Sequence, residues 1–372
     1  MIKMHRCNSI RVFIFFSIFF TLYIIAPENS FAESQCIKHR YIFDIGSSAT
    51  KINAYEIDYC TNKIINKHKE KEFYHYQSCI LHSKDSATLS ENCINDGIAV
   101  LAKIKKKYHI DCDKGKCIGI ATSWARNARN ISEWQNKIKS LGIKIKILSH
   151  DDEAILGFKS MKLAKEIAEG KLTQENIIMF DIGGGSFQII GLSDNNKEYF
   201  YHKGQNGTDT FVKLLVNTFR PNHKYQKDEI VIFNTTELEN IIDFSTELIA
   251  NSFRNDANFA KALNNKISSG NVTLFGNSML MTYGVRKQMG LNKSIITDEE
   301  IRKIAVSFCG LSVEKIEEMY PKLPRNLIFS MQSAMVLVYS IMKNLNMTEL
   351  HIIDVDASDY LALTLEEDKN FE

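Results

Sequence analysis

Two stretches in separate halves of the chain repeat one short pattern, and this repeat constrains the fold more than any other feature. Residues 41–52 read Tyr-Ile-Phe-Asp-Ile-Gly-Ser-Ser-Ala-Thr-Lys-Ile, and residues 179–190 read Met-Phe-Asp-Ile-Gly-Gly-Gly-Ser-Phe-Gln-Ile-Ile. In each, an apolar run enters an Asp, breaks into Gly and Ser, and resumes, which predicts a β-hairpin with a tight turn. Glycine lets backbone N–H groups approach an anion closely. Two such turns predict two similar domains that face each other across a phosphate-binding cleft.

The apolar periodicity after each hairpin is also repeated. In the first half it predicts a strand at 63–76, helices at 87–108, 131–141 and 151–168, and strands at 117–122 and 144–148. In the second half it predicts strands at 198–201, 272–275 and 350–355, and helices at 208–219, 237–263, within 297–346 and from 357. The order βββαβαβα, present twice, is that of the α/β actin-like ATPase (ribonuclease H-like) fold. We predict domain I at 33–170 and domain II at 171–372.

The N-terminal segment has the layout of a secretory signal peptide. Basic residues precede a largely apolar run from Val12 to Ala26, and Ser30-Phe-Ala32 offers a small-x-small cleavage site. The run of about 15 residues is short for a membrane span. We expect residues 1–32 to be removed and the chain to be exported, periplasmic or secreted, with no membrane association afterwards. An uncleaved signal anchor is the alternative.

The charge balance bears on the class of partner. The chain has 46 basic and 44 acidic residues, and residues 1–32 hold three of the basic and one of the acidic ones. The mature chain is therefore electrically neutral by this count, which gives no support for binding nucleic acid through a global basic field. Its 44% hydrophobic and 24% charged residues are typical of a globular protein.

Export changes the interpretation of the cysteines, because closely spaced pairs favour disulfides in an oxidising compartment. Cys112 and Cys117 form the clearest pair, for which a zinc site is the weaker alternative. We expect two further disulfides and one buried free thiol: Cys79 with Cys93, Cys36 with Cys60, and Cys309 alone.

Four segments together resemble the exopolyphosphatase/guanosine pentaphosphate phosphatase (Ppx/GppA) family. They are Asp44-Ile-Gly-Ser-Ser, Ala121-Thr-Ser-Trp-Ala-Arg-Asn-Ala-Arg-Asn130, Ser149-His-Asp-Asp-Glu-Ala-Ile-Leu-Gly-Phe158 and Asp181-Ile-Gly-Gly-Gly-Ser186. The resemblance covers about residues 40 to 360 and corresponds to short members of the family, without an extra C-terminal helical domain. It implies hydrolysis of a phosphoanhydride, for which phosphates must be held, their charge offset and a water activated in line with the scissile bond.

The resemblance also implies roles for individual residues. The two turns would hold phosphates from opposite sides of the cleft, through Gly46, Ser47 and Ser48 and through Gly183, Gly184, Gly185 and Ser186. Asp44 and Asp181 would hold Mg²⁺, or another divalent cation, through waters, as hard oxygen ligands do. Arg126 matches the family arginine that binds phosphate oxygens in a bidentate manner. Glu153 matches the proposed catalytic base, although a carboxylate in a first helical turn is also common as a partner of the helix dipole.

Several positions depart from the Ppx/GppA pattern. Ser48 replaces an Asn, Asp152 replaces a Glu, and Gln188 stands where the family has a functional Glu. An amide cannot act as a base and is a poorer metal ligand than a carboxylate. Ser47, Ser48 and Gln188 also resemble the secreted apyrases, which hydrolyse nucleoside tri- and diphosphates and share this fold.

Three functions follow as expectations. The first is an exported, Mg²⁺-dependent hydrolase that releases phosphate from polyphosphate or a related chain. The second is an apyrase-like hydrolase of nucleotides, and the third is a phosphate- or polyphosphate-binding protein with reduced activity. The expected partner is thus a polyphosphate or nucleotide-type substrate, and whether the chain forms a homodimer is left open.

Overall fold

The computed structural model describes residues 36–47, 49–72, 74–81, 87–112, 116–163, 172–193, 198–226, 229–270, 272–277, 284–286, 290–291, 293–323, 325–353 and 357–364. The predicted signal peptide at 1–32 and Ser48 of the first turn lie outside these residues. None of the helices in the described ranges combines the length and the apolar character needed to span a bilayer.

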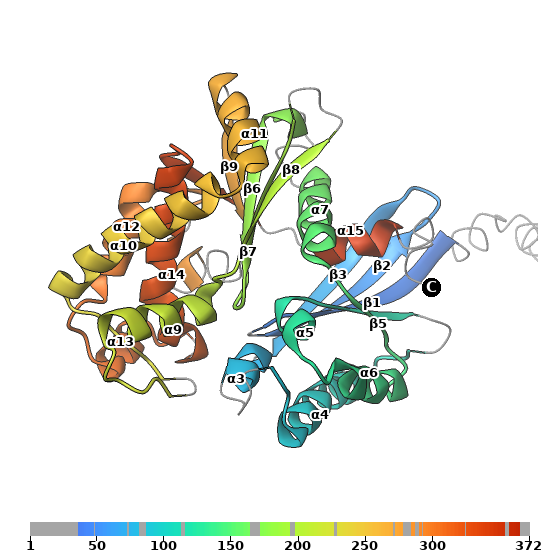
Figure 1. Ribbon diagram of the computed structural model, residues 1–372. Coiled ribbons are helices and arrows are strands. Elements are labelled where there is room, and N and C mark those ends of the chain that lie inside the picture. Colours follow the sequence, from blue (N-terminus) through green and yellow to red (C-terminus); the bar gives the residue numbers. More distant parts are fainter. Residues whose placement is uncertain are drawn as a thin grey trace, which may run out of the picture.

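The first half of the chain forms a five-stranded sheet with the order β3-β2-β1-β4-β5. Its strands are β1 (Ile37–Ile45), β2 (Thr50–Asp58), β3 (Lys63–Glu72), β4 (Cys117–Ala121) and β5 (Lys144–Ile147). The first three strands are antiparallel, whereas β4 and β5 run parallel to β1. Four helices lie along this sheet (Figure 1): α3 (Tyr76–Leu81), α4 (Glu91–Lys107), α5 (Ser123–Asn127) and α6 (Ile131–Ser140).

The second half forms a six-stranded sheet with the order β10-β11-β9-β6-β7-β8. Its strands are β6 (Ile177–Ile182), β7 (Phe187–Leu192), β8 (Tyr199–Gly204), β9 (Thr273–Asn277), β10 (Ile295–Thr297) and β11 (Glu349–Ile352). Apart from the edge strand β10, the order and directions repeat those of the first sheet. The predicted repeat is thereby confirmed, and with it the α/β actin-like ATPase fold. The helices of this half are α9 (Thr208–Phe219), α10 (Thr235–Arg254), α11 (Ala257–Ser268), α12 (Asp298–Ser307), α13 (Val313–Met319) and α14 (Arg325–Asn344).

Two helices cross from one half of the chain to the other sheet. Helix α7 (His150–Ser160) follows the first sheet in sequence, but its Ala154 and Phe158 pack in one apolar cluster with strands β6 and β7. Helix α15 (Ala357–Thr364) is the last described element, yet its Leu361 and Ala362 pack on β1 and β2 of the first sheet. Figure 1 shows this red helix against the blue strands. We call the first sheet with α3–α6 and α15 the first lobe, and the second sheet with α7 and α9–α14 the second lobe.

Three disulfides join the six cysteines that were expected to pair. The bonds are Cys36–Cys60, Cys79–Cys93 and Cys112–Cys117, with Cα–Cα distances of 5.4, 6.3 and 4.9 Å. These distances are ordinary for disulfides. All three disulfides lie in the first lobe, and the three expected pairs are confirmed.

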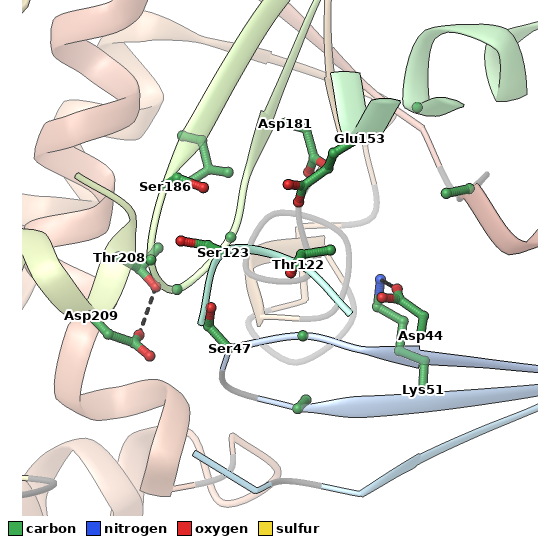
Figure 2. Close-up of a pocket in the computed structure, with 18 of the residues that line it drawn as sticks. Asp44, Ser47, Lys51, Thr122, Ser123, Glu153, Asp181, Ser186, Thr208 and Asp209 are labelled. Carbon is green, nitrogen blue, oxygen red and sulfur yellow. Dashed lines mark hydrogen bonds and ion pairs between the residues drawn. The ribbon is translucent and has the colours of Figure 1, made fainter. Parts of the chain in front are cut away.

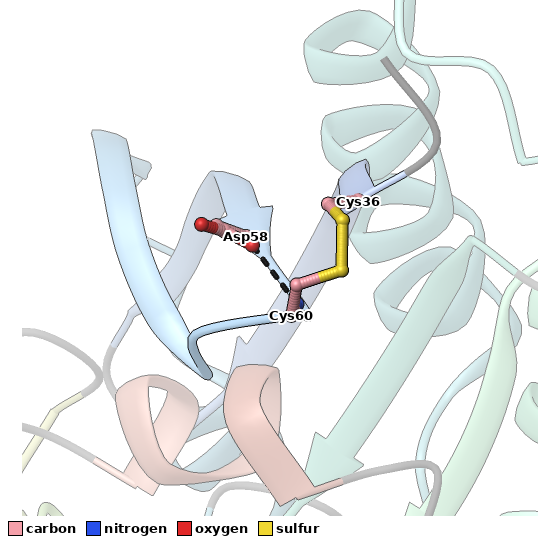
Figure 3. A group of neighbouring side chains, drawn as sticks. All are labelled: Cys36, Asp58 and Cys60. Atoms are coloured by element: carbon pink, nitrogen blue, oxygen red, sulfur yellow. Dashed lines mark hydrogen bonds between the residues drawn. A yellow bond between two sulfur atoms is a disulfide. The ribbon is translucent and has the colours of Figure 1, made fainter. Parts of the chain in front are cut away.

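The disulfide Cys36–Cys60 lies beside a carboxylate, as Figure 3 shows. Cysteines with an acidic neighbour can hold a metal, but both sulfurs are bonded to each other. The Oδ1 of Asp58 accepts hydrogen bonds from the backbone N–H groups of Cys60 (2.9 Å) and Thr61 (3.2 Å). The carboxylate therefore closes the turn between β2 and β3.

The structure differs from the predicted elements in a few places. The predicted helix at 237–263 is two helices, because Asp256 interrupts the pattern and caps α11 by accepting from the N–H of Phe259 at 3.1 Å. The predicted third strand ends at Glu72, and the short helix α3 begins at Tyr76, whose ring stacks on Trp124 at 4.0 Å. Cys309 is free, as expected, but only half-buried and outside α12.

Candidate active site

A cleft between the two lobes brings the two repeated turns together. Its described lining includes Gly46 and Ser47 from the turn between β1 and β2, and the segment Asp181–Ser186 from the turn between β6 and β7. Helix α7 contributes Glu153, and α9 contributes Asp209. In Figure 2 the labelled side chains surround one space, with Glu153, Asp181, Asp44 and Lys51 toward one side and Thr208 and Asp209 toward the other.

The first turn carries an ion pair. Asp44 on β1 lies opposite Lys51 on β2, and Asp44 Oδ2 accepts a hydrogen bond from Lys51 Nζ at 2.9 Å. The backbone N–H of Gly46 donates to the carbonyl of Ala49 at 2.9 Å, which closes the turn. The carbonyl of Ser47 accepts from the N–H of Gln77 at 3.1 Å, so α3 supports the turn from outside the hairpin. The register of the hairpin thus places the ammonium group of Lys51 beside Asp44, one of the two predicted metal ligands.

The second turn is held by the start of a helix. The carbonyl of Gly183 accepts from the N–H of Thr208 at 2.9 Å, and that of Gly184 accepts from the N–H of Asp209 at 2.8 Å. The turn therefore satisfies N–H groups that have no partner within α9 itself. Gly207 permits this contact, because a Cβ there would lie 2.3 Å from the carbonyl oxygen of Gly183.

Gln188 supports the second turn from behind. It pairs across the hairpin with Asp181 and is 1% exposed. Its side-chain Nε2 donates to Ser186 Oγ at 3.1 Å, and it does not line the cleft, whereas Ser186 does. The residue that departs from the family pattern is therefore a buried neutral support for the serine of the second turn.

Glu153 and Arg126, the two predicted catalytic residues, contact each other. Arg126 Nη1 donates to Glu153 Oε2 at 2.7 Å, and their side chains are 14% and 15% exposed. The same Nη1 donates to the carbonyl of Leu148 at 2.9 Å. Burial raises the pKa of Glu153, and the positive charge of Arg126 opposes this rise. Glu153 lines the cleft and Arg126 does not.

The donors in the cleft suit a hydrated divalent cation. Asp44, Asp181 and Glu153 supply carboxylate oxygens, which Mg²⁺ prefers. Among the described residues these three do not bring an oxygen each within 4.8 Å of one another, so they form no compact direct cage. Mg²⁺ usually keeps several waters, and carboxylates on separate walls fit that habit. Asp44 and Asp181 therefore remain the residues that would hold the ion, with Lys51 competing for Asp44.

Several residues of the cleft lie outside the predicted set. These are Lys51, Thr122, Ser123, Thr208, Asp209 and Ser330. Lys51 could have been found from hairpin register, since it stands as far after the turn as Asp44 stands before it. Thr208 and Asp209 follow the third strand as a Gly-Thr-Asp helix start, which is a weak signal. Nothing local in the sequence indicated Ser330, because α14 approaches the cleft only through packing.

Comparison with known proteins supports the resemblance found from the sequence. Residues 68–205 match the sequence model of the Ppx/GppA phosphatase family. This part of the chain runs from β3 to the end of β8, and it contains Arg126, Glu153 and the second turn but not the first. The predicted resemblance to the Ppx/GppA family is confirmed. A search of curated proteins finds no sequence that matches the chain.

Solved structures share the fold at low sequence identity. The Ppx/GppA family member of Aquifex aeolicus is 14% identical, with a TM-score of 0.61 over 89% of this chain and 99% of that chain. An exopolyphosphatase-like protein is 13% identical, with a TM-score of 0.64 over 88% of this chain and 98% of that one. An exopolyphosphatase from Cytophaga hutchinsonii is 14% identical, with a TM-score of 0.59 over 88% and 97% of the two chains.

Proposed function

We propose that this chain is a Ppx/GppA-type phosphoanhydride hydrolase that releases phosphate from polyphosphate or a related substrate, starting from the family match over residues 68–205. One observation carries the proposal: both glycine-serine turns and the carboxylate of Glu153 line a single cleft. Turns of this kind bind phosphate through backbone N–H groups, and a carboxylate beside them can accept a proton from water.

The charges in the cleft explain why a cation is needed. Four carboxylates line it, those of Asp44, Glu153, Asp181 and Asp209, against the single ammonium group of Lys51 among the described residues. A phosphate chain entering this cleft would be repelled unless a divalent cation offset the charge. Bound Mg²⁺ would supply that charge and polarise the phosphoryl oxygens. Asp44 and Asp181 would hold it.

The reaction uses Glu153 as general base. The carboxylate accepts a proton from water as the water oxygen attacks the terminal phosphorus, and the bond from this phosphorus to the bridging oxygen breaks. The leaving phosphate keeps the bonding electrons. The turns Gly46–Ser47 and Gly183–Ser186 hold the phosphate groups in line for this displacement. A base whose pKa is raised by burial is better matched to neutral pH.

The proposal predicts that Glu153→Gln removes hydrolysis while binding persists. We expect the mature chain to release phosphate from polyphosphate with Mg²⁺, and the variant to be slower by about 100-fold or more, as for loss of a general base. The measurements are phosphate release and polyphosphate binding by calorimetry. Asp152→Asn is the matched control, since this neighbouring carboxylate is exposed and does not line the cleft. A wild-type chain that releases no phosphate from any phosphoanhydride would exclude the hydrolase.

An apyrase-like activity is the second candidate, and Gln188 favours it. The neutral amide behind Ser186 matches the apyrase pattern, and the three disulfides suit an exported chain. Comparison of ATP, ADP and polyphosphate at equal phosphate concentration separates the candidates. A higher kcat/KM for ATP and ADP would select the apyrase. Binding of polyphosphate by both wild type and Glu153→Gln, without hydrolysis by either, would select the binding protein.

Export remains part of the proposal, because residues 1–32 have signal-peptide layout and the six cysteines of the first lobe are paired. A fusion of residues 1–40 to a reporter that is active only outside the cytoplasm tests it. An inactive fusion would contradict export.

A further inference from the structure

Arg126 contacts Glu153 but, unlike Glu153, is not among the described residues that line the cleft. The guanidinium comes from α5, at the end of the first sheet, and the carboxylate comes from the first turn of α7. Nη1 makes both described contacts of this guanidinium, to Glu153 Oε2 at 2.7 Å and to the carbonyl oxygen of Leu148 at 2.9 Å. Leu148 follows β5 directly and is buried. The arginine is therefore fixed to the sheet and in turn fixes the glutamate.

The rest of the guanidinium is buried and is not part of the described lining of the cleft. Its Nε and Nη2 are buried and have no hydrogen-bond partner among the described residues. The described cleft lining includes Thr122 and Ser123 of the same segment, and Glu153 and Leu148 on either side, but not Arg126. A phosphate in the cleft would meet the glutamate before it met the arginine.

We propose that Arg126 is a positioning residue, which acts on the reaction by orienting and charging Glu153 and not by binding a substrate phosphate. This inference rests on the proposed hydrolase function and replaces the phosphate-binding role that the family resemblance implied for Arg126. A guanidinium that donates to both a carboxylate and a backbone carbonyl has a fixed orientation, so the base is held on one side of the cleft. The same contact favours the ionised carboxylate that can accept a proton.

The charges around Glu153 decide what removal of Arg126 would do. Arg126 and Lys51 lower the pKa of the glutamate, whereas burial and the negative charge of Asp44 raise it. Asp181 lines the same cleft and lies on the same side of it as Glu153 in Figure 2. Without Arg126, only Lys51 would oppose the rise in the pKa of Glu153 that burial and the neighbouring carboxylates cause. The glutamate then stays protonated to higher pH, and a protonated carboxyl cannot accept a proton from water.

The test is the pH dependence of kcat/KM for polyphosphate at saturating Mg²⁺. In Arg126→Gln we expect the acidic limb of the profile to move up by about 1 pH unit or more, the size of an arginine's effect on a neighbouring carboxylate. The affinity for polyphosphate, measured by calorimetry on the Glu153→Gln background, should change by less than about threefold. Arg126→Lys keeps the positive charge, so its acidic limb should lie much closer to the wild-type pH than that of Arg126→Gln.

Arg129→Gln is the matched control, because this arginine is exposed and lies on the same segment. It should leave the limb in place. A limb that stays in place in Arg126→Gln while polyphosphate affinity falls tenfold or more would overturn the inference and restore the phosphate-binding role, with the hydrolase intact.

A second measurement does not depend on activity. The carboxyl resonance of Glu153 in protein carrying ¹³C-labelled glutamate, assigned with Glu153→Gln, should titrate at higher pH in Arg126→Lys and Arg126→Gln than in wild type, and more so in the latter. Equal titration in all three proteins would overturn the inference even if the chain proved inactive. An inactive wild type with the expected shift would contradict only the hydrolase.

Discussion

The two repeated hairpins share a backbone but differ in what lies opposite the aspartate. Asp44 pairs with Lys51 across the first hairpin, and the two form an ion pair that faces the cleft. Asp181 pairs with Gln188 across the second, and the buried amide donates to Ser186 instead. One hairpin thus presents a positive charge beside its aspartate, whereas the other has a neutral support behind its serine. A duplicated scaffold can be given unlike electrostatics by a single cross-strand position.

The two turns also differ in how they are held. Among its described residues, the first turn accepts a hydrogen bond from the N–H of Gln77 of α3, and Trp124 Nε1 donates to the carbonyl of Ile45 just before the turn. The carbonyl groups of the second turn accept hydrogen bonds from the first N–H groups of α9, and the close contact leaves no room for a side chain at Gly207. The second turn is therefore part of a helix start, and displacement of one displaces the other.

The largest effect should come from Gly207→Ala. Its Cβ would lie 2.3 Å from the carbonyl oxygen of Gly183 and 2.4 Å from the N of Ser186, and backbone atoms must move. We expect a loss of about 1–3 kcal/mol in the free energy of unfolding and about 100-fold in phosphate release. Gly46→Ala is the control, since its Cβ would lie 3.1 Å from a single carbonyl oxygen, that of Ala49. Equal losses in both variants would show that the two turns are equally constrained.

A comparable effect on stability is expected from the disulfides, which only the first lobe has among the described residues. Replacement of Cys79 and Cys93 by Ser opens a loop of 14 positions and should cost about 3 kcal/mol. Both tryptophans of the chain, Trp124 and Trp134, lie in the core of the first lobe, so fluorescence reports this lobe while circular dichroism reports both.

In urea, the fluorescence midpoint of this double variant should fall more than the circular dichroism midpoint. Cys309→Ser is the control and should move neither by much, because this free thiol is half-buried. Coincident shifts of the two signals would show that the lobes unfold as one unit.

The smallest effect should come from Gln188→Glu, which makes the second hairpin as charged as the first. Burial and the opposite Asp181 disfavour a carboxylate here, so its pKa in the folded chain should lie above its unfolded value of about 4.3. Stability relative to wild type should then be unchanged below about pH 4 and fall as pH rises, by about 1.4 kcal/mol at pH 8 for a rise of one pKa unit. Urea unfolding at pH 5 and pH 8 measures this, and an equal deficit at both pH values would contradict the explanation.

The sequence by itself determined the repeat, the strand order that follows from it and the three disulfide pairs. These features are encoded locally: alternating apolar residues set the hairpins, Gly and Ser set the turns, and closely spaced cysteines favour pairing with each other. The repeat of the two turns predicted the cleft between the two halves, whereas the resemblance to the Ppx/GppA family predicted that Glu153 belongs to the site. It failed where a single residue ended an element, as Asp256 does between α10 and α11.

Only the tertiary structure decided which side chains meet. Arg126 and Glu153 are separated by a helix and a strand in sequence, and the parallel pairing of β4 with β5 brings the first turn of α7 beside α5. Gln188 lies behind its serine because other elements cover both faces of β7. Such contacts depend on packing between elements that are distant in the chain, where small differences in crossing and register select the partner. The residue types therefore indicated a phosphate-binding site, whereas packing decided which side chains, such as Arg126 and Glu153, contact each other.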